Sequence, residues 1–291
     1  MIPKRSADSS RKWLLGTVLF AVVIAAHFPA SRNAFIWDDD SYLTENALVQ
    51  SPDGLGRIWF EPLASPQYYP LVFSTFWLEH RIWGLAPPGY HWVNILLHAG
   101  SAVLLWVALL RLSAPGAWLA ALWFGIHPVH VESVAWVTER KNVLSGIFYL
   151  GSFLACLHAF RLDGREEATA GEGFGRRAYI LGLSLFACAL LSKTVTATLP
   201  IAVAIVFWWK RGHIDSPALW KRLAPFFFLG AIAGGTTAWL EAYHVGAKGA
   251  EWSLSAIERI LVAGRAVARR ARIFHPRQVV GHGIDDLTSG Y

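Results

Sequence analysis

The sequence has few charged residues for its length. Asp, Glu, Lys and Arg make up 16% of the 291 residues, whereas soluble domains carry about 25%. Apolar residues make up 54% of the chain, and its mean hydropathy is +0.38. This balance excludes a disordered chain and a water-soluble enzyme, and it predicts an integral membrane protein embedded in a lipid bilayer.

Cysteine and methionine are also scarce, with two Cys and one Met. Cys156 and Cys188 lie inside apolar runs, so the sequence predicts no disulfide framework. The net charge of +6 would suggest nucleic-acid binding in a soluble protein. In a membrane protein Lys and Arg instead mark the cytoplasmic side, and we expect no nucleic-acid partner.

Apolar runs that approach the length of a bilayer crossing recur along the chain. They predict about seven spans, at residues 13–30, 92–110, 118–126, 143–160, 178–191, 199–209 and 223–240. Alternation from a cytoplasmic N-terminus places 13 Lys and Arg on the inner side and seven on the outer side, as the positive-inside rule requires. The expected fold is an all-α, polytopic helical bundle in a membrane. Residues 1–12 form a basic cytoplasmic tail, and residues 13–253 form the membrane domain.

The long outer segment 31–91 opens with three consecutive carboxylates, Asp38, Asp39 and Asp40. Two carboxylates that share a site raise the pKa of one, which is how a general base is prepared. Successive helical residues point about 100° apart, so at most two of the three can face one substrate. A solvated turn or a helix start is the alternative. Asp38 and Asp39 can also hold a divalent cation such as Mg²⁺ or Mn²⁺, and the sequence leaves this open.

A second polar cluster follows residue 126, after the shortest apolar run. His127 and His130 are three residues apart and share a helical face, and with Glu132 they could suggest a metal site. Glu132, however, follows His130 by only two residues and is poorly placed on that face. Histidines hydrogen-bonded at the membrane interface are the alternative. Glu139 closes this cluster, where a solvated helix end is the alternative reading.

Three of the seven cations on the outer side, which the charge rule disfavours, lie in or beside these later polar motifs: Arg140, Lys141 and Lys193. Charges placed there at such cost often serve an anion. A lipid-linked phosphate at the interface is the natural candidate, because cations can stabilise a departing phosphate while a carboxylate takes a proton from a hydroxyl.

Four ordered motifs carry a family resemblance: FIWDDDSYLTEN (35–46), YPLVFSTFWLEHRIWGLAPPGYHWVNILLH (69–98), HPVHVESVAWVTERKNVLS (127–145) and LLSKTVTATLP (190–200). Residues 33–199 resemble the N-terminal membrane half of the tetratricopeptide-repeat-associated GT-C glycosyltransferases. That group includes bacterial membrane proteins and the animal transmembrane-and-tetratricopeptide O-mannosyltransferases.

The resemblance implies a GT-C fold and inverting transfer from a polyprenyl-phosphate-linked sugar donor to a protein or glycan hydroxyl. The transfer would occur on the periplasmic or lumenal face, and we expect the chain to lie in a bacterial inner membrane. Asp38 and Asp39 correspond to the family's acidic pair at the active site, and Arg140, Lys141 and Lys193 would hold the donor phosphate. The remaining residues would shape the substrate site: His127, His130, Glu132, Glu139, Trp136 and Tyr69.

The end of the chain departs from the family pattern. Members continue with further membrane helices and a tetratricopeptide array, whereas residues 254–291 here are basic. We expect this tail to be a surface or disordered segment without a tetratricopeptide array, in an apparently truncated chain. Two other functions therefore stay open: a non-catalytic membrane scaffold and a transporter or flippase of lipid-linked anions.

Overall fold

A computed structural model describes residues 4–65, 67–162 and 172–245, together with 255, 257, 258, 261, 262, 264 and 265. The chain divides into two compact units, Met1–Leu240 and Glu241–Tyr291. In the second unit the described structure consists of the short turn η7 (Glu241–Val245) and a few helical residues. The predicted basic tail 254–291 lies almost entirely outside the described residues.

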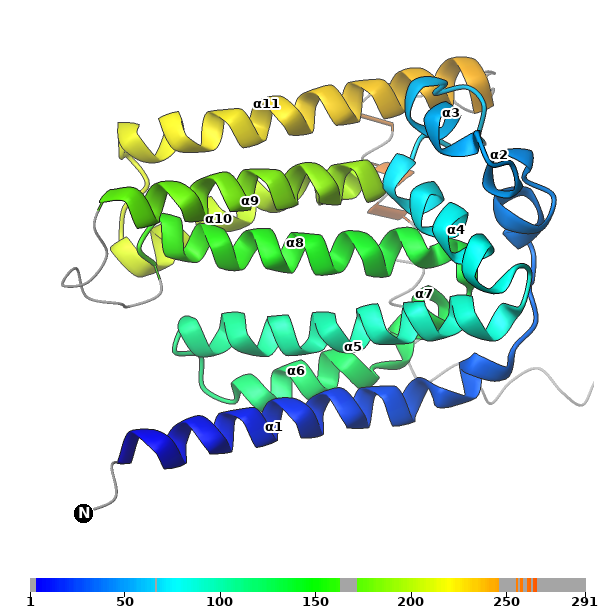
Figure 1. Cartoon of the computed structure of the whole chain (residues 1–291). Helices are drawn as coiled ribbons and strands as arrows, with labels where there is room; N and C mark the ends of the chain where they lie inside the picture. Colours follow the sequence, from blue (N-terminus) through cyan, green and yellow to red (C-terminus); the bar gives the residue numbers. More distant parts are fainter. Residues whose placement is uncertain are drawn as a thin grey trace, which may run out of the picture. The chain divides into compact units, whose positions relative to one another are not determined.

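All regular structure in the described part of the first unit is helical, so the predicted all-α class is confirmed. Seven helices lie alongside one another (Figure 1): α1 (Lys4–His27), α5 (Pro87–Arg111), α6 (Ala117–Ile126), α8 (Arg140–Ala159), α9 (Glu172–Ser192), α10 (Leu199–Arg211) and α11 (Pro217–Leu240). Each coincides with a predicted apolar run, and the chain reverses direction between successive helices. The three outer segments that carry the predicted site therefore lie at the same end of the bundle.

Four helical segments are long and apolar enough to cross a membrane: Ser9–Arg32, Pro87–Arg111, Val137–Ala159 and Pro217–Tyr243. The ten-residue α6 is apolar but short, as the sequence predicts, because Pro128 cannot continue the helix. Helices α9 and α10 run beside these segments, and the predicted total of about seven crossings stays a prediction.

Small residues bring α8 and α9 close together. Gly182 faces Cys156 and Ala155, Gly151 faces Leu185, and the Ser152 hydroxyl donates to the Gly182 carbonyl at 2.6 Å. In lipid the hydrophobic effect does not drive one helix onto another, so close van der Waals contact and interhelical hydrogen bonds carry the association.

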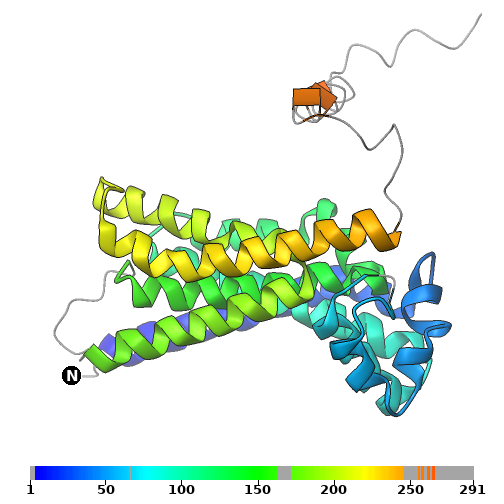
Figure 2. The ribbon, with the colours of Figure 1, turned by 90° about the horizontal axis from the view of Figure 1, so that it is seen from above.

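The outer segment 31–91 folds into short helices at one end of the bundle (Figure 2). They are η1 (Phe28–Arg32), η2 (Asp40–Thr44), α2 (Ala47–Gln50), α3 (Gly54–Phe60) and α4 (Pro70–Trp83). An apolar cluster that includes Leu43, Val49, Phe73 and Phe76 is buried among them. The segment that bears the acidic motif is therefore a packed layer with a core of its own.

Local packing in this layer predicts opposite effects for two glycines of α3. A Cβ at Gly54 would collide with the Leu48 backbone carbonyl, whereas a Cβ at Gly56 would meet nothing within 4 Å. We expect Gly54→Ala to lower the free energy of unfolding by about 1–3 kcal/mol through overpacking. The control Gly56→Ala should be neutral or stabilising by up to ~1 kcal/mol. Thermal unfolding in detergent would compare the two, and equal transition temperatures would contradict the packing at Leu48.

Candidate active site

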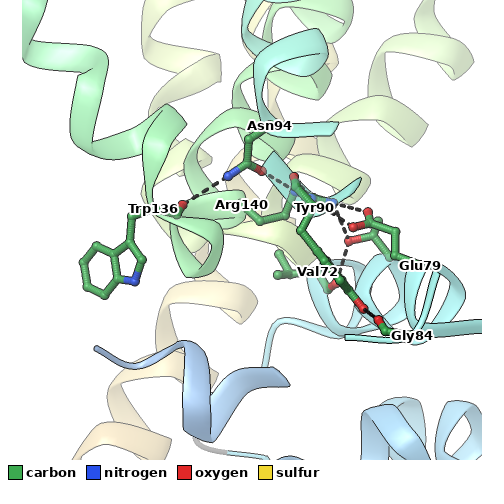
Figure 3. A network of polar contacts seen from close by, with 8 residues as sticks. Val72, Glu79, Gly84, Tyr90, Asn94, Trp136 and Arg140 are labelled. Atoms are coloured by element: carbon green, nitrogen blue, oxygen red, sulfur yellow. Dashed lines mark hydrogen bonds and ion pairs between the residues drawn. The ribbon is translucent and has the colours of Figure 1, made fainter. Parts of the chain in front are cut away.

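A fully buried arginine, Arg140, begins α8 at the end of the bundle that carries the predicted site. Its guanidinium forms a two-pronged ion pair with Glu79 of α4, with Nη2 donating to Oε2 at 3.1 Å. Nη2 also donates to the Tyr90 carbonyl at 2.9 Å, and Nε donates to the Asn94 side chain of α5. Figure 3 shows how these groups converge from three helices.

These contacts revise the expectation that Arg140 holds the donor phosphate. A buried guanidinium whose donors already meet a carboxylate, an amide and a carbonyl has no group left for a ligand in the outer layer. Its role in the structure is to fix its neighbours: Asn94 also donates to the Trp136 carbonyl at 3.1 Å, as Figure 3 shows. Arg140 thereby holds both ends of the short stretch that contains Trp136, Glu139 and itself.

The two predicted catalytic carboxylates occupy different environments. Asp39 is completely buried, whereas Asp38 is exposed. The Asp39 carboxylate accepts hydrogen bonds from the Thr138 amide at 2.8 Å, the Thr138 hydroxyl at 2.5 Å and the Ile36 amide at 2.9 Å. Asp39 therefore ties the acidic motif to the turn before α8, and Asp38 is the exposed carboxylate of the predicted pair.

Three charged side chains meet beside this tether. Glu139, in the turn η4 (Val137–Glu139), pairs with Lys141 at 2.9 Å and lies 3.8 Å from Lys193. Asn142 bridges the group, because its side chain donates to Glu139 and accepts from the Lys193 ammonium. The structure thus brings together Lys141 and Lys193, which are far apart in the sequence, around one carboxylate.

Burial also shapes the protonation of this cluster. It lowers the pKa of Lys193, and the nearby positive charge of Lys141 lowers it further while Glu139 opposes both. Burial raises the pKa of the Tyr42 phenol, and Tyr69, Asp38 and Glu139 raise it further. Tyr42 therefore stays protonated between the acidic motif and the cations, with Lys141 Nζ 5.4 Å from its ring centre.

Tyr69, another predicted site residue, is buried directly before α4 in the apolar cluster under the acidic motif. Glu132 is exposed in the first turn of α7 (Val131–Ala135). Tyr69 thus belongs to the apolar core next to the acidic motif. Among the described residues, no contact links Glu132 to the charged cluster.

The predicted histidines have aromatic neighbours instead of a charged cluster. The His130 ring, in η3 (Pro128–His130), lies 5.1 Å from that of His98 and 6.4 Å from that of His127. His98 and His27 each place Nε2 3.0 Å from the carbonyl of Gly125 in the last turn of α6, and the Val129 amide, which would continue the helix by bonding to that carbonyl, donates to His127 Nδ1 instead. Burial lowers the pKa of His130, as do the charges of His127 and His27. The packed rings and the two contacts with the Gly125 carbonyl anchor the end of α6.

Within the described residues no group of three or more His, Cys, Asp or Glu side chains is arranged to hold a metal ion. Both carboxylate oxygens of Asp39 are engaged by protein donors. The divalent cation that the sequence leaves open would therefore have Asp38 as its free protein ligand in the acidic pair.

Sequence reasoning missed several residues that build the site: Tyr42, Glu79, Asn94, Thr138 and Asn142. Glu79 and Asn94 fall within the second quoted motif, and Thr138 and Asn142 within the third. The signal available was an acid and an amide inside otherwise apolar helices, where each must find a partner. Tyr42 carries no comparable signal.

Comparison with known proteins supports the family resemblance. The human protein O-mannosyl-transferase TMTC4 is 31% identical over 201 residues, which cover 60% of this chain and 27% of the relative. The human protein O-mannosyl-transferase TMTC2 is 31% identical over 224 residues, which cover 74% of this chain and 26% of the relative. The mouse protein O-mannosyl-transferase TMTC3 is 31% identical over 165 residues, which cover 53% of this chain and 18% of the relative. The resemblance inferred from the four motifs is thereby confirmed, and the matched region spans about a quarter of the length of these relatives or less.

No family model matches the chain. No solved structure matches it either.

The Arg140–Glu79 pair predicts a strongly non-additive stability cycle. Arg140→Met or Glu79→Met alone leaves one buried charge unpaired and should cost about 3–5 kcal/mol, whereas replacing both should cost far less than the sum. The control is the exposed Arg57–Glu61 pair of α3, where Arg57→Gln should cost at most about 1 kcal/mol. Thermal unfolding of the four variants measures the cycle, and additive losses at Arg140 and Glu79 would exclude a coupled pair.

Proposed function

We propose that this chain is the membrane part of a glycosyltransferase that moves a sugar from a polyprenyl-phosphate carrier to a hydroxyl group of a protein or glycan. The names of the relatives support a protein O-mannosyl-transferase activity. The observation that carries the proposal is that an exposed carboxylate, Asp38, lies on a segment tied directly to the turn η4, which bears Glu139 and leads into Lys141 at the start of α8.

The reaction needs a base and an anion site at a short distance from each other. The carboxylate of Asp38 would accept the proton of the acceptor hydroxyl as its oxygen attacks the anomeric carbon. The bond between that carbon and the phosphate oxygen would break on the opposite face, and its electron pair would remain on the phosphate. Lys141 and Lys193 would stabilise the released phosphate. Glu139 would serve as their counterion before the donor arrives.

The same arrangement suits a lipid-borne donor. The cations lie where helices α8 and α9 begin and end, respectively, so a phosphate at the edge of the bilayer could reach them without its lipid chain leaving the membrane. We propose that this end of the bundle faces the periplasm or lumen, with the N-terminus in the cytoplasm. We also propose that Asp38 can hold a divalent cation, and loss of transfer on addition of a chelator would test this.

The two aspartates should respond differently to amidation. Asp38→Asn removes the base and should lower transfer by about 10²–10⁴-fold while leaving the thermal stability unchanged. Asp39→Asn replaces an acceptor of the Ile36 or Thr138 hydrogen bonds with an amide donor, so it should lower stability together with activity. Transfer from polyprenyl-phosphate mannose and thermal unfolding, measured in the same preparations, would separate the effects.

Thr138→Val is the matched control for the tether, because it removes one of the hydrogen bonds to Asp39 while leaving every carboxylate in place. It should cost about 1 kcal/mol of stability and only a small part of the activity. Full activity in Asp38→Asn would refute the assignment of the base, and a wild-type chain that neither binds nor transfers the sugar would favour a scaffold.

The lowered pKa of Lys193 predicts a limit at alkaline pH. Phosphate binding needs the ammonium form, so kcat/KM should fall as pH rises through the pKa of Lys193, below the value of about 10.4 for an ordinary lysine. Lys193→Arg should move this alkaline limb to higher pH, because a guanidinium keeps its charge. A profile of kcat/KM against pH measures it, and identical profiles for both proteins would remove Lys193 from the phosphate site.

A further inference from the structure

Trp37, the residue before Asp38, has an unusual backbone conformation and an exposed ring. Its φ is +50°, in the left-handed region that bulky residues rarely adopt, and 71% of the residue is exposed. Two other non-glycine residues share a positive φ within the described residues, Ser113 and Arg161. Both directly follow the last turns of helices α5 and α8, where left-handed residues are a normal ending.

Trp37 follows no such helix end, so its conformation needs another reason. Strained backbone persists where the surroundings hold it and often accompanies a binding site. The hydrogen bonds to Asp39 fix the chain directly after Trp37. They hold the indole outside the apolar cluster below the acidic motif instead of allowing it to fold in.

The exposed indole is packed edge-on against a second one. The ring centres of Trp37 and Trp136 are 5.0 Å apart and their planes are inclined by 83°. Trp136 is held through its carbonyl by Asn94, and its ring centre lies 5.9 Å from Lys141 Nζ. The two indoles are therefore in contact with each other, and the pair reaches from the residue beside Asp38 to Lys141, a cation of the proposed phosphate site.

The donor itself places a sugar in that position. In a glycosyl phosphate the pyranose ring lies between the phosphate and the carbon that the acceptor attacks. One face of a pyranose presents C–H groups with partial positive charge, which complement the negative face of an indole. We propose that Trp37 and Trp136 form a platform on which the pyranose ring of the lipid-linked donor rests, an inference that builds on the proposed function.

The rival explanation is that Trp37 anchors the protein at the membrane interface, which is a common role of tryptophan. The two roles differ in the ligand that they affect. A platform acts only on a carrier that bears a sugar, whereas an anchor acts on the sugar-bearing and the bare carrier alike. Trp13 of α1 is the matched control, because it is 77% exposed and lies at the opposite end of the bundle.

The experiment measures the binding of polyprenyl-phosphate mannose and of polyprenyl phosphate to the whole chain in lipid nanodiscs. Trp37→Ala should weaken binding of the sugar-bearing carrier by about three- to tenfold and leave binding of polyprenyl phosphate unchanged. Trp37→Phe, which keeps an aromatic face, should recover part of the loss. Trp13→Ala should alter neither affinity. Equal losses for both carriers, or no loss for either, would overturn the platform.

Failure of the proposed function would appear differently, as a wild-type chain that binds neither carrier. In that case saturation-transfer NMR with methyl α-mannopyranoside tests the platform directly. Transfer from the protein to the sugar C–H protons that disappears in Trp37→Ala would sustain the platform without the proposed reaction. A signal that is absent from the wild type, or unchanged in the variant, would remove it.

Discussion

The buried ion pair between Arg140 and Glu79 is the interaction on which this end of the molecule depends. It joins the first residue of α8 to the short helix α4, and through Asn94 and Tyr90 it reaches α5. Desolvating two charges is costly, so such a pair contributes little net stability but penalises every arrangement that separates its members. Because Glu139 and Lys141 flank the buried arginine, fixing one guanidinium also fixes the two charged groups beside it.

A second contact, between Asp39 and Thr138, fixes the same region from the side of the acidic motif. The Asp39 carboxylate accepts a hydrogen bond from the amide of Thr138, the residue immediately before Glu139. The acidic motif is therefore held in a fixed position relative to the charged cluster around Glu139. Among the charged residues of these two segments, Asp39 and Arg140 are buried in contacts that position the backbone, whereas Asp38 is exposed and Glu139 pairs with Lys141. Neighbouring charged residues in such a motif can therefore have different roles, one buried and structural and the next exposed.

The sequence predicted the helical class, the positions of the seven bundle helices and the gathering of the outer motifs at one end, because apolar runs and chain alternation determine these features. The structure places Lys141 and Lys193 around one carboxylate, and their joint action on a donor phosphate stays a prediction. The sequence did not distinguish the exposed Asp38 from the buried Asp39. It also assigned Arg140 to the donor phosphate, whereas in the structure Arg140 pairs with Glu79. Both distinctions depend on partners distant in the sequence, Thr138 and Glu79, and only tertiary packing determines those pairings. The histidines were likewise singled out as a polar pair, whereas His27 and His98 determine their surroundings.

The separation of Glu79 from Arg140 along the chain also bears on how the protein is made. The ribosome delivers the layer formed by residues 31–91, with its apolar core, before the arginine has been synthesised. Until α8 emerges, the carboxylate of Glu79 has no Arg140 to pair with, and burying it as an unpaired charge would be costly. We therefore expect the layer to close fully around Glu79 only after Arg140 has been synthesised. The ion pair would thereby make the packing of residues 31–91 depend on a helix that follows them in the chain.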